Sequence, residues 1–140
     1  MQIPIFSLNK IKLKKNNKNI LKINNFDIHR GAAYFINGNM ASGKTCLLNL
    51  IGKEDVPSEG EILYENDKLL KISNSLFSQE VAYVKQDFKV TWWNNGTVEN
   101  FLNKTLNKYK HISNVDSKIS NISRAMDIKH LFTTKLSSLT

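Results

Sequence analysis

The most constraining feature of this sequence is the octapeptide at residues 38–45, GNMASGKT, which has the spacing G-x-x-x-x-G-K-[ST]. A loop that wraps around phosphates must point successive backbone N–H groups inward, and glycine adopts the necessary dihedral angles at little cost. A helix beginning near Gly43 adds unpaired N–H groups and the positive end of its dipole. The pattern therefore predicts a phosphate site formed by Gly38, Asn39, Met40, Ala41, Ser42, Gly43, Lys44 and Thr45.

Two residues of this stretch have chemical roles beyond the backbone. Lys44 would supply a mobile positive charge for the β- and γ-phosphates, and the hydroxyl of Thr45 would bind Mg²⁺. Cys46 follows directly and has two interpretations. It is either a thiol activated by the start of the helix or a small packing residue.

The flanking sequence predicts a strand, a loop and a helix in the order that such a site requires. The apolar run 32–37 is typical of a short strand buried on both faces. Leu47, Leu48 and Ile51 give the following segment one apolar side, and Gly52 can end that helix. Upstream, period-two segments at 11–14 and 20–28 surround a polar stretch at 15–19, which predicts an antiparallel hairpin.

Downstream segments predict two further strands and two helices. The strands are expected at 61–66 and 80–86. Each helix has one apolar face, formed in the first by Val98, Phe101, Leu102, Leu106 and Tyr109, and in the second by Val115, Ile119, Ile122 and Met126. The predicted fold is α/β, a single domain over 1–140 with a β-rich core holding the glycine loop in 1–95 and a helical subdomain in 96–140.

Composition and charge narrow the class of protein. A chain of 140 residues that is 41% hydrophobic and 23% charged suits one soluble globular domain, and no apolar run reaches the roughly 20 residues that span a bilayer. The N-terminus lacks the features of a secretory signal, and the single cysteine excludes an internal disulfide and fits a reducing compartment.

The net charge of +8 comes almost entirely from lysine, with one cluster at residues 9–19. That cluster is either a contact for nucleic acid or an anionic membrane, or a solvated hairpin. No aromatic residues alternate with its lysines, as a platform for single-stranded nucleic acid requires, so nucleic acid is not an expected partner.

Other phosphate-binding classes fit poorly. The base-reading motif N-K-x-D of GTPases is absent, and Arg30 and Arg124 are too few and too scattered for a nucleotide kinase.

The chain resembles instead the N-terminal part of the ATP-binding subunit of an ABC transporter. The resemblance rests on HRGAAYFINGNMASGKTCLLNLIGKEDVPSEGEILYEND (29–67), VAYVKQDF (81–88), GTVENFL (96–102) and LFTTKLSSLT (131–140).

The resemblance implies an incomplete P-loop NTPase core with an N-terminal antiparallel β subdomain and the start of a helical subdomain. It implies ATP and Mg²⁺ as cofactors, with Thr45 and Gln86 as metal ligands and Lys44 and Gln86 in catalytic roles. From the residues alone, Gln86 is also compatible with an exposed strand end. The paired residues Trp92 and Trp93 would face a transmembrane partner or pack between subdomains.

The same resemblance implies partners and a location. A second ATP-binding subunit would form a homo- or heterodimer with this one, and an integral membrane permease would be driven by the pair. The protein would lie peripherally on the cytoplasmic or organelle-interior face of a membrane and would not be secreted.

The sequence departs from the family pattern in two places. The family's aromatic residue for adenine is missing near Leu13, Lys14 and Lys15, and Phe6 lies too early to replace it. The chain also ends inside the signature motif, so the region with the hydrolytic carboxylates is absent and ATP hydrolysis stays open. Two alternatives are a non-transport ABC ATPase working on nucleic acid or iron–sulfur assembly, and a degenerate nucleotide-binding fragment.

Overall fold

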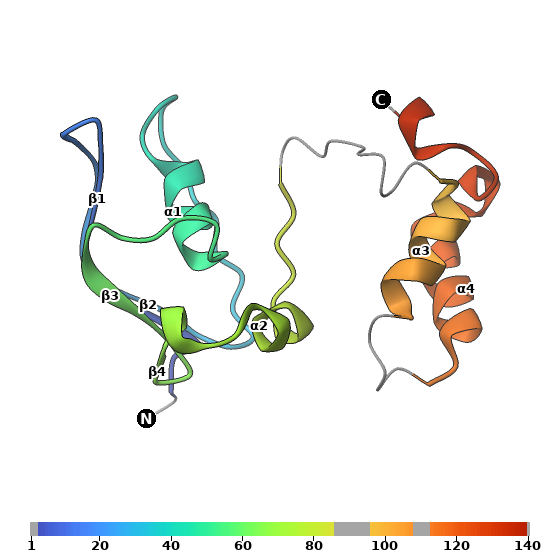
Figure 1. Cartoon of the computed structure of the whole chain (residues 1–140), viewed down its shortest axis with the longest axis horizontal. Coiled ribbons are helices and arrows are strands. Elements are labelled where there is room, and N and C mark those ends of the chain that lie inside the picture. Colours follow the sequence, from blue (N-terminus) through green and yellow to red (C-terminus); the bar gives the residue numbers. More distant parts are fainter. Residues whose placement is uncertain (1–2, 86–95, 108–112, 140) are drawn as a thin grey trace. The chain divides into compact units, whose positions relative to one another are not determined.

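A computed structural model describes residues 3–85, 96–107 and 113–139. It divides the chain into two compact units, Met1–Tyr83 and Val84–Thr140, and each is described by itself (Figure 1). The first unit contains the strands and the glycine loop, and the second contains helices. The assignment of these parts to a P-loop core and a helical subdomain stays a prediction.

The first unit is built on a four-stranded antiparallel sheet with the order β2-β1-β3-β4. The strands are β1 (Phe6–Lys15), β2 (Lys18–Ile28), β3 (Glu59–Tyr64) and β4 (Asp67–Lys68). Asn16 and Asn17 both have positive φ, 51° and 60°, which is the geometry of the two-residue turn that best matches strand twist. The predicted hairpin is therefore confirmed, and β3 confirms the strand expected near 61–66.

The core of this unit lies between the sheet and its helices. The helices are α1 (Lys44–Ile51), α2 (Asn74–Glu80) and the short 3-10 turn η1 (Leu69–Lys71). Leu8, Ile11, Leu50 and Leu69 are fully buried, so β1, α1 and η1 all contribute to one apolar cluster. The rings of Phe6, Tyr64 and Phe77 extend this cluster, with centroids 5.0–6.4 Å apart.

Two predicted buried strands are not found. Residues 32–39 and 81–85 have no strand pairing in the described part of the chain, and Phe35 and Val84 are 91% and 90% exposed. A strand buried on both faces needs neighbouring strands on its edges and layers above and below it. No described residue supplies such a neighbour to either segment, so Phe35 and Val84 meet solvent.

The second unit contains α3 (Val98–Leu106) and α4 (Val115–Ala125), followed by the 3-10 turns η3 (Lys129–Leu131) and η4 (Leu136–Ser138). Both predicted helices are confirmed. Thr97 caps α3 by accepting a hydrogen bond from Asn100 N, and the N–H of Val98 donates to Thr134 O at 3.1 Å. No helix in the described residues is long and apolar enough to cross a membrane.

The apolar face predicted for α4 is partly wrong. Ile119 is buried, but Ile122 and Met126 are 38% and 66% exposed, while Ser123 is buried instead. Ser123 sits four residues after Ile119 and satisfies its hydroxyl by donating to Ser120 O at 2.8 Å. The pattern of apolar residues predicts burial of Ile122, but Ser123 is buried in its place. A small polar residue can take a buried position when its hydrogen bond is made within the helix. Tyr109, predicted on the face of α3, lies outside the described residues.

Candidate functional site

The glycine loop at residues 38–43 turns back on itself immediately before α1. The N–H of Ser42 donates to Asn39 O at 3.2 Å, which closes a tight turn, and Ala41 has a φ of 62°. Gly43 takes a left-handed conformation, φ 90°, at the N-cap of α1. A Cβ there would lie 3.3 Å from Ile20 O and from a methyl group of Leu21, so glycine lets the loop pack closely on β2.

Lys44 places its ammonium group over the loop that precedes it. Nζ donates to Gly38 O and Asn39 O, both at 2.7 Å, and lies 3.4 Å from Ser42 Oγ. An ammonium group has three N–H donors, so these three oxygens match its full capacity. The positive charge is thus held at the mouth of the loop instead of extending into solvent.

The backbone at the start of α1 carries unused donors. The first N–H groups of any helix lack partners within the helix. In residues 3–85, 96–107 and 113–139, no acceptor is bonded to the N–H groups of Gly43, Lys44 and Thr45. No side chain caps this end, and the first turn has no acidic residue. The site therefore combines a positive helix end, free amide donors and an ammonium group, which together suit a multiply charged anion.

Glycine at position 38 also leaves room for the Ser42 hydroxyl inside the loop. A Cβ on Gly38 would lie 2.7 Å from Ser42 Oγ, so any larger residue would displace the serine from the inside of the turn. Its N–H donates to Asn37 Oδ1 at 2.8 Å, a contact that the sequence pattern did not predict. The signal was present, because asparagine often bonds to the neighbouring backbone at the start of a turn.

Neither Phe6 nor Leu13 offers a surface for a flat aromatic ligand group. Phe6 is buried in the core with Tyr64 and Phe77, which excludes it as a surface for stacking. Leu13 is buried as well. The sequence has no aromatic side chain at 13–15. Because Phe6 is buried, it does not replace that missing side chain.

The lysines at the end of β1 form ion pairs with acidic side chains. Lys12 and Lys14 both pair with Glu59, at 2.5 and 2.7 Å, and their hydrogen bonds lower the pKa of Glu59 to about 2. Lys15 pairs with Asp55 at 2.7 Å, and this hydrogen bond raises the pKa of Lys15. The cation that faces the glycine loop is therefore Lys44 and none of these three.

The residues fit a metal ion that arrives with a phosphate ligand. The side chain of Thr45 is exposed at the first turn of α1, and its hydroxyl is a hard oxygen ligand. No group of three or more His, Cys, Asp or Glu side chains gathers anywhere in the described residues. Mg²⁺ is commonly held by one or two protein ligands together with phosphates and water, so Thr45 and a phosphate are a suitable start. Gln86, Trp92 and Trp93 lie outside the described residues.

A model of the ABC transporter family matches residues 21–140. The chain belongs to this family. It is 32% identical over 89 residues to the methionine import ATP-binding protein MetN of Chlamydia pneumoniae, an alignment that covers 61% of this chain and 26% of MetN. It is also 32% identical over 75 residues to the macrolide export ATP-binding/permease protein MacB of Campylobacter jejuni, covering 51% of this chain and 12% of MacB.

The fold of this ABC family member agrees with that of a solved relative. The dimeric ATP-binding cassette MJ0796 of Methanocaldococcus jannaschii, bound to ADP and Pi after hydrolysis, aligns with a TM-score of 0.74 at 21% identity. The alignment covers 96% of this chain and 63% of that one. The predicted α/β class, an antiparallel sheet with helices in a partial ABC-type ATP-binding domain, is therefore confirmed. The chain spans less than two thirds of each of these three relatives.

Proposed function

We propose that this chain is the ATP-binding part of an ABC transporter and that residues 38–45 hold the phosphates of ATP. The observation that carries the proposal is the ammonium group of Lys44, which lies over the loop that leads into α1. Within the described residues, the N–H groups at the start of that helix have no bonded acceptor. A cation and several amide donors at the junction of the loop and the helix suit a polyphosphate better than a neutral ligand or a single carboxylate.

In this proposal Mg²⁺ accompanies the nucleotide. The hydroxyl of Thr45 and the side-chain oxygen of Gln86 would bind the metal, because an amide oxygen and a hydroxyl are both hard donors. Lys44 would also neutralise charge on the terminal phosphates, and this gives it and Gln86 their proposed catalytic roles. Bound Mg²⁺ would supply electrostatic stabilisation of the same phosphates.

The proposal is tested by comparing ligands that differ in phosphate number. Thermal unfolding of the whole chain is measured with ATP, ADP, AMP and adenosine, each with Mg²⁺. If phosphates supply the binding energy, ATP and ADP raise the Tm and adenosine does not. A ligand present at 100 times its Kd stabilises the folded state by about 2.7 kcal/mol, which corresponds to a shift of several degrees. An equal response to ATP and adenosine, or no response to ATP, would contradict the proposal.

The proposed partners are a second ATP-binding subunit and an integral membrane permease, and the proposed location is peripheral, on the cytoplasmic or organelle-interior face of a membrane. Support comes from the names of the relatives, since MacB is a combined ATP-binding and permease protein and MJ0796 was solved as a dimer. We expect the tagged protein, solubilised from its host in mild detergent, to co-purify with a polytopic membrane protein. Recovery with nucleic acid and a steep loss of binding with salt would favour a non-transport ATPase instead.

A further inference from the structure

The outer edge of β2 has no partner strand among the described residues. The sheet order places β2 at one edge, with β1 on its inner side. An edge strand offers a row of unpaired N–H and C=O groups that another extended chain can join. The side chains of β2 therefore decide what this edge can pair with.

The alternation of side chains along β2 reverses in the middle of the strand. Leu21, Ile23 and Ile28 pack against the apolar cluster of the core. Phe26 lies opposite the buried Leu8 and therefore shares that face of the sheet. In an uninterrupted strand, residues on one face are an even number of positions apart. Ile23 and Phe26 are three positions apart, so the alternation reverses between them.

This reversal makes the strand complementary to a second copy of itself. Two β2 strands can pair antiparallel about a two-fold axis midway along residues 21–28. Ile23 then faces Phe26 of the second copy, and Leu21 faces Ile28 of the second copy, with both pairs on the core side. Without the reversal, each of these pairs would join residues from opposite faces. Phe26 is 38% exposed in the single chain, so the pairing covers apolar surface.

The same pairing matches two charged residues on the other face of the strand. Lys22 and Asp27 are exposed, and within residues 3–85, 96–107 and 113–139 neither side chain has an ion pair. Across the hairpin Lys22 faces Lys12, and like charges directly opposite each other are unfavourable. The two-fold pairing places Lys22 opposite Asp27 of the second copy, and symmetry forms this pair twice.

We propose that β2 is a self-association surface, through which two copies of this chain pair antiparallel along residues 21–28 and join their sheets. The partner is a second copy because the apolar residues and the opposite charges of this strand fall at positions that match one another under a two-fold rotation. Residues 38–45 lie outside this strand, so the inference does not rest on the proposed function. We expect the dimer to form without nucleotide and, because the interface is small, to be weak.

The experiment measures dimerisation of the whole chain by sedimentation without nucleotide, using two complementary charge reversals. Asp27→Lys and Lys22→Asp each place like charges opposite each other in their own dimer. We expect the dimer Kd of each variant to rise about tenfold or more above that of wild type. In an equal mixture the two variants meet with opposite charges at both positions. The mixed dimer should therefore recover an affinity within about threefold of wild type.

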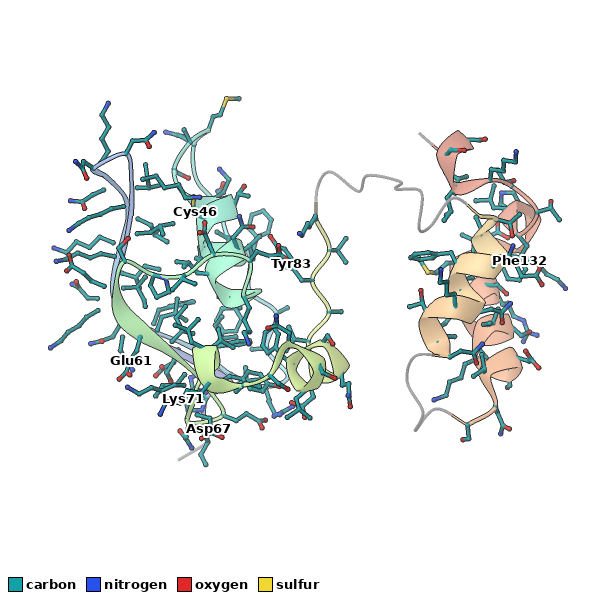
Figure 2. All side chains as sticks on the ribbon, in the orientation of Figure 1. Cys46, Glu61, Asp67, Lys71, Tyr83 and Phe132 are labelled. Carbon is teal, nitrogen blue, oxygen red and sulfur yellow. The ribbon has the colours of Figure 1, made fainter. Side chains whose placement is uncertain are left out.

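The matched control is Asp67→Lys, which lies on β4 at the other edge of the sheet (Figure 2). It changes the net charge by the same amount as Asp27→Lys, so it separates edge pairing from general repulsion between basic molecules. Its dimer Kd should stay within about threefold of wild type. Far-ultraviolet circular dichroism checks that each variant is folded.

Three results would overturn this inference. They are a wild-type protein that stays monomeric at millimolar concentration, a wild-type dimer that Asp67→Lys weakens as much as Asp27→Lys does, and a mixture of the two reversals that stays as dissociated as each variant alone. None of these results bears on the proposed function, because ATP binding by the wild type is measured separately.

Discussion

Replacing Lys44 with alanine is expected to abolish measurable ATP binding while the protein stays folded. The substitution removes the ammonium group that lies over the glycine loop, 2.7 Å from Gly38 O and Asn39 O. A hydrogen bond to a charged group contributes about 1.5–3 kcal/mol, and one ammonium group can make several to a polyphosphate. We expect the Kd for MgATP, measured by calorimetry, to rise by about a hundredfold or more, equivalent to about 2.7 kcal/mol.

The control for this substitution is Lys22→Ala, which removes the same charge from β2. Lys22 faces Lys12 across the hairpin and lies outside the glycine loop. Its loss should change ATP affinity by less than threefold, and both variants should keep the far-ultraviolet circular dichroism of wild type. An affinity for MgATP in Lys44→Ala that stays within threefold of wild type would show that the loop does not bind the phosphates.

Replacing Gly60 with alanine is expected to cause the largest loss of stability of any glycine-to-alanine change in this chain. Gly60 has a φ of 87°, and a Cβ there would lie 2.4 Å from Lys10 O and 2.5 Å from Asn9 O. These are backbone atoms of β1 at the place where its register with β3 shifts. A left-handed alanine costs about 1–2 kcal/mol, and overpacking against atoms that cannot rotate away adds about 1–3 kcal/mol.

The free energy of unfolding of Gly60→Ala is measured by urea denaturation and compared with that of Gly31→Ala. Gly31 also has a left-handed φ, 73°, but a Cβ there meets nothing within 4 Å. The two variants therefore share the conformational cost and differ in the clash. We expect Gly31→Ala to lower the free energy of unfolding by about 1 kcal/mol and Gly60→Ala by about 4 kcal/mol. Equal losses would mean that β1 and β3 separate easily at this bulge.

The parts of the fold that depend on local patterns could be predicted from the sequence. The two asparagines between period-two segments specify the tight turn of the β1–β2 hairpin, and the octapeptide specifies both the loop and the start of α1. These features are decided within about ten residues of chain. The fold class also followed, because the motifs that resemble the ABC family occur in the family's order.

The parts that depend on distant partners could not be predicted in this way. An apolar run such as 32–37 has the composition of a buried strand, but whether it pairs depends on strands elsewhere, and no described residue pairs with it. The burial of Ser123 in place of Ile122 depends on how α4 packs on its neighbours. The contact of Tyr83 with Asn49 joins residues 34 positions apart, and neither residue type indicates the other. The roles of the residues at 38–45 and of Gln86 stay predictions.

If the loop binds phosphates as proposed, the position of Lys44 would determine which anions it accepts. Its ammonium group already has oxygen neighbours from Gly38, Asn39 and Ser42, so an incoming anion must compete with these dipoles for the same cation. Chloride or a lone carboxylate has a single negative charge and competes weakly with these carbonyl groups for the ammonium group. A polyphosphate has several negative oxygens and competes more strongly. The hydrogen bonds of Lys44 also fix its side-chain rotamer before any anion binds. Anion binding therefore avoids much of the roughly 2 kcal/mol of conformational entropy that a free lysine side chain loses when it is immobilised. In the proposed function, the loop would therefore favour polyphosphates over weakly charged anions, because the protein's own carbonyl groups compete for the same ammonium group.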